Sequence, residues 1–477
     1  MPKQVVTRFA PSPTGFLHVG GLRTALYNFL FAQKNQGRFL FRIEDTDQKR
    51  AVPGAMNDLK KILKSFGLKW DNKKIIIQSK RLKIYQKFGK QLITQKKAYY
   101  CFCPEERLAE LRKNQIAQNL PPRYDGLCRN LEKTEIEKKL KSDLPYVIRF
   151  KIPQTGITEF NDLIRGKVSF DNKILDDQIL IKSDGFPTYH LASVTDDHEM
   201  RITHVIRGEE WLPSTPKHIL LYEALGWEKP EFAHLPLLLN PDRSKLSKRQ
   251  GDISVEEYLK KGYLPETLLN FILLLGWNPG TNQEIFSLKE MIKIFSLEKI
   301  NKAGAVFDLQ KLDWLNGYYL RHLSLKELAK LSQPFFKAAG IKKGLKTLEP
   351  VVATEQQRIK KLEEIVMATE FFFQEPTYDK KLLLWKQMSS EQAAKNLKIL
   401  LAELNLIAEN DWQQKKLENK ITNFINDQKL SIGEMLWPMR VALTGRQASP
   451  GNFEVAAILG KKKTLERIKY AIALLEK

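Results

Sequence analysis

Apolar residues near the start of the chain follow first a strand spacing and then a helical one. Residues 5–9 predict a short buried strand, and the Pro- and Gly-containing segment 10–15 predicts a tight loop. Apolar side chains then recur at helical spacing over residues 20–33, and residues 39–43 are strand-like again. This order of strand, loop, helix and strand predicts one βαβ unit of a parallel sheet.

The remainder of the chain divides into three regions with different sequence patterns. Residues 178–225 again alternate between strand and helix signals and predict a second part of the same α/β domain. Residues 100–177 hold all three cysteines, a charged helical segment and short strands, so we interpret them as a module inserted into that domain. After about residue 320 amphipathic helices follow one another, and the C-terminal third is predicted to be all-α.

The length and the net charge of the chain limit the number of domains and the kinds of function that are expected. The chain has 477 residues and a formal net charge of +23 at pH 7. The length predicts about three domains, and the basic excess favours a polyanionic partner, nucleic acid first. The longest apolar stretch, 264–277, is interrupted by polar residues and is too short to span a bilayer. The first residues leave no room for the apolar region of a signal peptide, so we expect a soluble cytoplasmic protein.

His18 lies at the end of a proline-stiffened loop, just before the paired glycines Gly20 and Gly21. Glycines at this place let a ligand approach the backbone, and the start of the next helix offers unpaired N–H groups to an anion. The segment has neither the Walker pattern nor the Gly-x-Gly-x-x-Gly fingerprint. Taken alone, it is more typical of an ordinary turn with a hydrogen-bonded histidine.

A second loop, at 242–251, gathers Lys245, Lys248 and Arg249 around the small Ser247. Lysines act as movable point charges for phosphate, so the loop fits the charge that develops in phosphoryl or adenylyl transfer. On its own, such a charge run is more typical of a solvated loop. Its Lys-Leu-Ser-Lys-Arg sequence, combined with Pro-Ser-Pro-Thr-Gly-x-x-His-x-Gly-Gly near the N-terminus, resembles the two signatures of class I aminoacyl-tRNA synthetases.

Further motifs narrow this resemblance to bacterial glutamyl-tRNA synthetases. They are Arg42-Ile-Glu-Asp-Thr-Asp47, Pro187-Thr-Tyr-His190, Thr203-His-Val-Ile-Arg-Gly-Glu-Glu-Trp211, Phe307-Asp-Leu-Gln-Lys-Leu312 and Trp437-Pro-Met-Arg-Val-Ala-Leu-Thr-Gly445. The matches span nearly the whole chain in order. Gly21 stands where many class I enzymes have His, and the glutamyl branch commonly has Gly there.

The resemblance implies a glutamate-tRNA ligase that forms glutamyl-adenylate from ATP and transfers glutamate to the 3′-terminal adenosine of tRNA(Glu). It implies an α/β Rossmann-type catalytic domain with an inserted α+β module, followed by all-α anticodon-binding domains. The segments are the first catalytic half at 1–99, the module that meets the acceptor end at 100–190, the second catalytic half at 191–240, a stem-contact region at 241–325 and the helical anticodon-binding region at 326–477. Arg358, Arg440 and Arg446 are candidates for phosphate contacts in the last of these.

Residue roles follow from the same resemblance. The catalytic residues would be His18, Lys245 and Lys248, and the ATP-binding residues His18, Gly20, Gly21, Glu210, Trp211, Leu237, Lys245, Ser247 and Lys248. Magnesium is expected with ATP. The residues around the amino acid would be Arg8, Ser12, Glu44, Tyr189 and Arg207, with Glu44 facing the ammonium group. Ser193 stands where some relatives carry Asn.

All three cysteines lie within one short segment, as Cys101, Cys103 and Cys128. Cysteines two residues apart can point to one side of an extended turn, and three thiolates suit zinc, which takes four ligands in a structural site. Some relatives use a tyrosine as the fourth ligand, which makes Tyr124 the candidate, while others carry a histidine where this chain has Asn130. The alternative is three reduced cysteines without metal. We interpret His190, His198 and His204 as packing or hydrogen-bonding residues.

Other readings differ in features of the sequence. A glutaminyl-tRNA synthetase shares the catalytic fold, but its anticodon-binding part would be β-barrels, and a tRNA-modifying glutamyl-queuosine enzyme would lack the helical third. A catalytically inactive RNA-binding paralogue would not need His18, Lys245 and Lys248, and a zinc-dependent nucleic-acid-binding module would leave most of the chain unexplained. The sequence leaves open whether tRNA(Gln) is charged as well as tRNA(Glu). A monomer is the default expectation.

Overall fold

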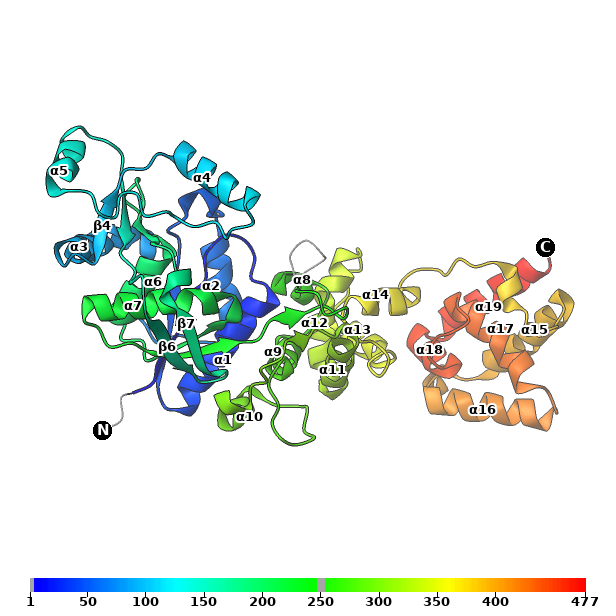
Figure 1. Ribbon diagram of the computed structural model, residues 1–477. Helices are drawn as coiled ribbons and strands as arrows, with labels where there is room; N and C mark the ends of the chain where they lie inside the picture. Colours follow the sequence, from blue (N-terminus) through cyan, green and yellow to red (C-terminus); the bar gives the residue numbers. More distant parts are fainter. Residues whose placement is uncertain (1–3, 247–253) are drawn as a thin grey trace. The chain divides into compact units, whose positions relative to one another are not determined.

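The computed structural model describes residues 4–246 and 254–477, and the chain divides into two compact units (Figure 1). Unit 1 comprises Met1–Leu259 and Pro265–Leu309, and unit 2 comprises Lys260–Leu264 and Gln310–Lys477. The finer division into five segments stays a prediction. None of the helices in these described ranges is both long and apolar enough to cross a membrane.

Unit 1 is built on parallel strands. β1 (Val6–Phe9) pairs in parallel with β2 (Arg38–Ile43), β2 pairs with β3 (Ile76–Ile77), and α1 (Val19–Lys34) connects the first two strands. β9 (His204–Gly208) pairs in parallel with β10 (Glu231–Leu235). The backbone N–H of Thr203 donates to the carbonyl of Val6 at 3.0 Å, which places β9 beside β1. The predicted βαβ unit is confirmed.

The inserted segment contributes to two sheets. β4 (Ala98–Cys101), β5 (Val147–Phe150) and β8 (Ile179–Ile181) form an antiparallel sheet. β6 (Ile157–Asp162) and β7 (Gly166–Asp171) form a hairpin, and β6 also runs parallel to β10. The strand near 180, which the sequence pattern assigned to the second α/β stretch, therefore pairs with the inserted segment. Its apolar side chains pack there, with Ile181 opposite Ile148.

Helices cover these sheets and complete unit 1. They are α2 (Ala55–Ser65), α3 (Leu82–Thr94), α4 (Glu105–Ala117), α5 (Lys133–Lys141), α6 (Tyr189–Glu199), α7 (Thr215–Leu225), α8 (Val255–Lys260), α9 (Pro265–Leu274) and α10 (Leu288–Ile294), with the short strands β11 (Leu238–Leu239) and β12 (Ala305–Val306). The core between them includes Leu40, Tyr85, Leu180, Leu191 and Val205. Because α6 packs on this core, the side chains along it are held against β1 and β2.

Unit 2 contains helices and connecting loops but no strand among its described residues, as the sequence predicts (Figure 1). Its helices are α11 (Leu309–His322), α12 (Leu325–Ala338), α13 (Leu345–Ala353), α14 (Glu364–Thr369), α15 (Ser390–Leu406), α16 (Gln414–Asp427), α17 (Ile432–Thr444), α18 (Asn452–Leu459) and α19 (Lys461–Leu475). Ser324 and Glu327 form a capping box at the start of α12, a strong local signal for that helix. One apolar core runs from Leu328 and Phe336 to Leu397 and Leu443.

Candidate active site

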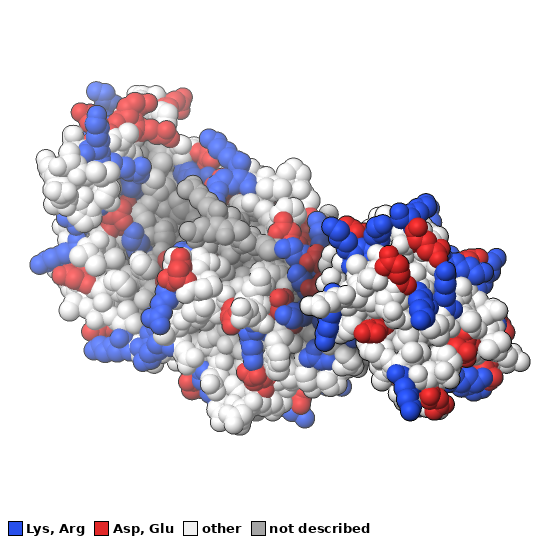
Figure 2. Space-filling model, turned by 90° about the vertical axis from the view of Figure 1, so that its right-hand side faces the viewer, with Lys and Arg blue, Asp and Glu red and all other residues white. Residues whose placement is uncertain are grey.

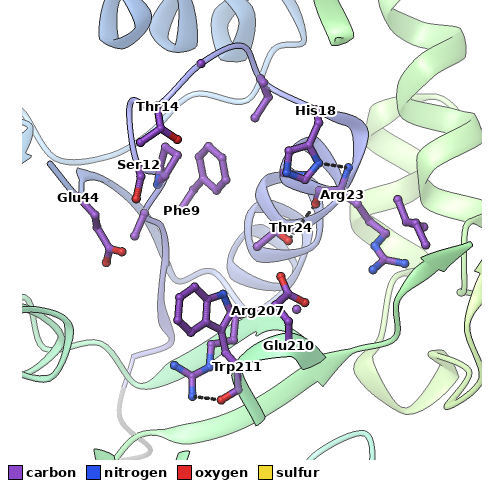
Figure 3. Close-up of a pocket in the computed structure, with 18 of the residues that line it drawn as sticks. Phe9, Ser12, Thr14, His18, Arg23, Thr24, Glu44, Arg207, Glu210 and Trp211 are labelled. Carbon is purple, nitrogen blue, oxygen red and sulfur yellow. Dashed lines mark hydrogen bonds between the residues drawn. The ribbon is translucent and has the colours of Figure 1, made fainter. Parts of the chain in front are cut away.

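A cavity of about 380 Å³ opens where β1, β2, β9 and β10 end (Figure 3). Ligands of open α/β sheets bind at these carboxyl ends. The described residues predicted for ATP and glutamate all line it: Arg8, Ser12, His18, Gly20, Gly21, Glu44, Tyr189, Arg207, Glu210, Trp211, Leu237 and Lys245. Ser247, Lys248 and Arg249 lie outside the described residues. The cavity thus combines a phosphate-type loop with three arginines, Arg8, Arg23 and Arg207, and two carboxylates, Glu44 and Glu210.

His18 caps the start of α1. Its Nδ1 accepts hydrogen bonds from the N–H groups of Gly20 at 3.1 Å and Gly21 at 3.3 Å, which assigns the proton of a neutral ring to Nε2. A Cβ on Gly20 would lie 3.0 Å from His18 Cε1, and a Cβ on Gly21 would lie 2.7 Å from Leu17 Cδ1. The paired glycines are therefore needed for this close approach of the loop to the helix, whose N-terminus favours an anion.

Lys245 reaches the cavity from a tight turn after β11. Ser244 N donates to Asp242 Oδ1 at 2.8 Å, and Leu246 N donates to the carbonyl of Leu238 at 3.0 Å. These bonds fold the start of the lysine loop back along β11. The first lysine of the predicted signature accordingly lies on the same cavity as His18.

Arg207, on β9, is held by neutral partners. Its Nε donates to His234 Nε2 at 3.1 Å, its Nη1 to the hydroxyl of Tyr189 at 3.0 Å and its Nη2 to the hydroxyl of Thr215 at 2.8 Å. His234 Nδ1 lies 2.6 Å from Asp162 Oδ2, which fixes the tautomer that accepts from the arginine. Burial lowers the pKa of His234, so its ring is neutral. None of these hydrogen-bond partners of Arg207 carries a negative charge.

Arg8 and Glu44 face the cavity from the ends of β1 and β2. The Nε of Arg8 donates to Asp197 Oδ1 at 3.1 Å, and Arg42 Nη2 donates to Glu44 Oε1 at 2.9 Å. Burial raises the pKa of Glu44, although Arg42 and Arg8 act in the opposite direction. Together, Arg8, Arg207 and Glu44 offer two cations and one anion to a ligand that carries both charge signs.

A second cavity, of about 400 Å³, shares Tyr189 with the first. Its lining is rich in cations: Arg112, Arg123, Arg149 and Lys217, with His190 and Asp176 beside them. A hydrogen-bonded pair of imidazoles connects the two cavities, because His190 Nδ1 lies 3.1 Å from His218 Nε2 and His218 Nδ1 lies 3.3 Å from Arg207 Nη1. Burial and the charges of Lys217 and Arg207 lower the pKa of His190 to about 4.

The other two histidines of this region have packing roles, as predicted. The ring of His198 stacks on Trp227 at 4.0 Å between centroids. His204 lies 4.9 Å from the ring of Phe31 and shares a hydrogen bond with the hydroxyl of Thr203.

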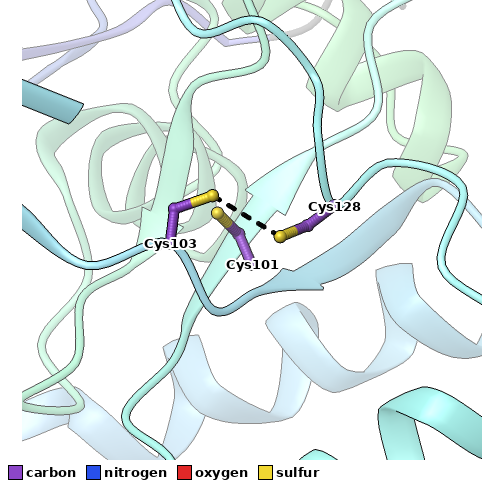
Figure 4. A group of neighbouring side chains, drawn as sticks. All are labelled: Cys101, Cys103 and Cys128. Atoms are coloured by element: carbon purple, nitrogen blue, oxygen red, sulfur yellow. Dashed lines mark hydrogen bonds between the residues drawn. The ribbon is translucent and has the colours of Figure 1, made fainter. Parts of the chain in front are cut away.

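The three cysteine sulfurs point toward one another (Figure 4), and all of them lie within 4.8 Å of each other. Cys103 Sγ is 3.6 Å from Cys128 Sγ, and the hydroxyl of Tyr124 is 3.4 Å from Cys101 Sγ and 3.5 Å from Cys103 Sγ. The hydrogen bond from Cys128 lowers the pKa of Cys101 to about 4 against the effect of burial, while burial raises the pKa of Tyr124. Three converging sulfurs with one nearby oxygen fit the donor set of a tetrahedral zinc site.

Several residues of the site escaped the sequence analysis. Arg42 was noted only within a motif, and Asp197, His218 and His234 were not singled out, although each is buried beside a residue that lines the cavity. Arg23, one turn into α1, is also buried and donates to the carbonyls of Pro236 and Leu275. The one available signal was the run of polar and charged residues Thr195-Asp-Asp-His198, which follows the mostly apolar residues 191–194 of the same helix.

Comparison with known proteins places the chain in a family. A family model described as tRNA synthetases class I (E and Q), catalytic domain, matches residues 4–314, and a model described as Anticodon binding domain matches residues 327–472. The sheet, its carboxyl-end cavity and the helical unit are therefore those of a class I tRNA synthetase, and the predicted fold class is confirmed.

Curated relatives and solved structures define the family more closely. Glutamate-tRNA ligases of Clostridium novyi and Clostridium tetani are 46% and 45% identical to this chain, over 99% of it and over 99% and 98% of their own lengths. The structure of a glutamate tRNA ligase from Elizabethkingia meningosepticum, in complex with its amino acid, is 37% identical with a TM-score of 0.90 and covers 99% of both chains. The chain belongs to the glutamate-tRNA ligase family.

Proposed function

We propose that this protein activates L-glutamate with ATP to glutamyl-adenylate and pyrophosphate, and then transfers glutamate to the 3′-terminal adenosine of tRNA(Glu). The main support for the proposal is that His18, Arg8, Glu44 and Arg207 all line the same cavity. One side of this cavity suits a nucleoside triphosphate and the other suits a dipolar amino acid with an additional carboxylate. Bringing the two reactants together is itself a large part of catalysis.

The nucleotide side has the parts needed for adenylyl transfer. The N-terminus of α1, exposed by Gly20 and Gly21, would hold phosphate oxygens together with His18. Lys245, with Lys248 and Ser247 of the same loop, would stabilise the charge that develops on the phosphorus. Glu210, Trp211 and Leu237 would hold the adenosine. Mg²⁺ would accompany the triphosphate and neutralise part of its charge.

The amino-acid side distinguishes the two ends of glutamate. Arg207 and Arg8 are rigid forks that match carboxylates, and Glu44 would bind the ammonium group. The ring of Tyr189, 4.2 Å from that of Trp211, closes one wall of the cavity, and Ser12 completes the set. Since Arg207 has only neutral partners in direct contact within the described residues, its charge is available to the substrate.

The second cavity is the proposed entry of the tRNA acceptor end. Its four cations suit the terminal phosphates, and the shared Tyr189 would bring the end of the RNA to the reacting carboxylate.

The anticodon would be bound by unit 2, where Arg358 is the most exposed of the three arginines singled out. Arg440 and Arg446 instead donate to backbone carbonyls, of Ser449 and Ala368 among others. On the face in Figure 2, Lys and Arg are interspersed with Asp and Glu, which suits contacts that position an RNA. A cytoplasmic monomer is the proposed working form.

The cysteine cluster is a proposed zinc site with a structural role. Cys101, Cys103 and Cys128 would supply three thiolates and Tyr124 the fourth ligand. The guanidinium of Arg149, 3.9 Å above the Tyr124 ring, lies on the wall of the second cavity. A metal here would cross-link β4 to the loop after α4 and so fix the cationic wall.

Charging of separate tRNA(Glu) and tRNA(Gln) transcripts with labelled glutamate, and then with labelled glutamine, tests the proposal. Glutamate attached to tRNA(Glu) alone would identify a discriminating ligase, and glutamate on both transcripts a non-discriminating one. The His18→Ala variant serves as the control for contaminating ligases. Attachment of glutamine, or of no amino acid, by the wild-type protein with ATP and Mg²⁺ would overturn the proposal.

A further inference from the structure

Arg8 and Glu44, which face the cavity with opposite charges, are joined behind it by two residues that do not line it. Asp197 Oδ1 accepts from Arg8 Nε at 3.1 Å and from Arg42 Nη1 at 2.7 Å. Arg42 Nη2 then donates to Glu44 Oε1 at 2.9 Å. The result is an alternating chain of four charges, Arg8, Asp197, Arg42 and Glu44, whose two ends reach the cavity and whose middle does not.

The fold explains why these side chains meet. Arg8 on β1 is opposite Leu40 on β2, so Arg42, two residues further on, points to the same face of the sheet as Arg8. α6 packs on that face. Tyr189 at its start lines the cavity, and Asp197 lies eight residues later on the same side of the helix. One helix thus supplies both a wall of the cavity and the carboxylate behind it.

The two middle residues are almost fully buried. The side chains of Arg42 and Asp197 are 0% and 4% exposed, and that of Arg8 is 5% exposed. Long side chains confined in this way keep one geometry, because each guanidinium fork is matched by a carboxylate. Nη1 of Arg8 has no hydrogen-bond partner among the described residues, and Arg8 lines the cavity, so this nitrogen is available to a ligand.

The neighbouring Asp196 is also a buried carboxylate on α6, but its hydrogen-bond partners are not residues that line the cavity. It accepts from Arg81 Nε at 2.9 Å, from Gln78 at 2.9 Å and from the hydroxyl of Tyr85 at 2.8 Å. It makes no hydrogen bond to Arg8, Arg42 or Glu44 among the described residues, although its Oδ2 lies 4.0 Å from Arg42 Nε. Asp196 therefore ties α6 mainly to the start of α3, whereas Asp197 ties it to the substrate-facing arginine.

We propose that Asp197 and Arg42 are positioning residues that fix the separation between Arg8 and Glu44, and thereby the length of the amino acid that the cavity accepts. This inference rests on the proposed function, in which Arg8 and Glu44 hold the two charged ends of glutamate. If Asp197 served only to neutralise Arg8, its removal would change KM for glutamate in the opposite direction. Without its carboxylate neighbour, Arg8 would attract an anionic substrate more strongly and KM for glutamate would fall.

The test compares Asp197→Asn with Asp196→Asn, which removes an equally buried carboxylate from the same helix. Pyrophosphate exchange in the presence of tRNA gives KM for glutamate, aspartate and ATP, and thermal unfolding gives Tm for both variants. We expect Asp197→Asn to raise KM for glutamate by about tenfold or more, to leave KM for ATP unchanged and to narrow the preference for glutamate over aspartate. Asp196→Asn should lower Tm similarly but raise KM for glutamate much less, because Asp196 approaches Arg42 only at 4.0 Å and makes no hydrogen bond to it among the described residues.

Two further variants keep the test decisive. Arg42→Lys preserves the charge but cannot reach Asp197 and Glu44 with one fork, so it should reproduce the higher KM for glutamate if Asp197→Asn does not fold. In an Arg8→Gln background, the part of the Asp197→Asn effect that acts through Arg8 should be lost, so the double variant should raise KM for glutamate by less than the product of the two single effects. Equal KM values in the two Asn variants, or a lower KM for glutamate in Asp197→Asn, would overturn the inference. Failure of the wild type to charge tRNA with glutamate would instead overturn the proposed function.

Discussion

The pH dependence of glutamate binding should follow the titration of Glu44. Its carboxylate binds the ammonium group only when it is ionised, so affinity is full at high pH and is lost as pH falls. Burial raises the pKa of Glu44, and its side chain is only 9% exposed. The loss should therefore begin at a higher pH than the value of about 4.3 for an ordinary glutamate. Below the pKa, each pH unit should weaken binding about tenfold, or about 1.4 kcal/mol.

Burial moves the titration of the neighbouring histidines in the opposite direction. It lowers the pKa of His190 to about 4 and also lowers the pKa values of His218 and His234. KM for glutamate should rise as the pH is lowered, with a limiting slope of one proton below the pKa of Glu44. KM for ATP, measured in the same assays, should not follow that slope.

The Glu44→Gln variant is the control, because glutamine has the shape of the protonated carboxyl group. We expect it to raise KM for glutamate at neutral pH by roughly 10- to 150-fold, equivalent to about 1.5–3 kcal/mol for one hydrogen bond to a charged group. Its profile should also be flatter, since the substrate's own carboxyl groups are the same in both proteins. An unchanged slope in Glu44→Gln would refute the assignment of the titration to this residue.

Three further predictions concern the loop, the arginine and the cysteines. Gly20→Ala should reduce kcat roughly 100-fold with little change in Tm, because the new Cβ would displace His18; an unaffected kcat in the exchange assay would contradict the proposed role of the loop. Asp162→Asn removes the acceptor that sets the His234 tautomer, so Arg207 should lose a partner and KM for glutamate should rise about tenfold, measured against KM for ATP as the control. A zinc chelator should lower Tm by several degrees and release zinc measurable with an indicator dye, whereas a Cys-to-Ser variant of the cluster should not respond; equal responses would argue against a metal.

Local patterns of the sequence predicted the elements that carry the catalytic loop. The apolar spacing at 20–33 and the helix-opening glycines correspond to α1, and the strand-like run at 39–43 corresponds to β2. These predictions worked because helix periodicity and strand alternation are properties of adjacent residues. The motifs identified by resemblance likewise located the described residues predicted for ATP and glutamate, and all of these line one cavity.

The buried supporting residues could not be predicted in the same way. Asp197 and Arg42 are separated by more than a hundred positions along the chain, and their contact exists only because α6 packs on the face shared by β1 and β2. His234 was hidden inside a strand whose pattern is mostly apolar. The pairing of β6 with β10 was missed for the same reason, since strand order depends on contacts distant in sequence.

The charges of the site suggest why glutamate rather than glutamine fits it. The ion-paired group behind the cavity, together with Arg207, contains four arginines (Arg8, Arg42, Arg81 and Arg207) and three carboxylates (Glu44, Asp196 and Asp197), so it holds one uncompensated positive charge. Glutamate carries one net negative charge at neutral pH and would neutralise it, whereas glutamine carries none. Binding glutamine would leave this positive charge desolvated opposite a neutral amide, as an unpaired buried charge. Selection against the amide therefore follows from the neutral histidine that holds Arg207, because a carboxylate in its place would remove that charge.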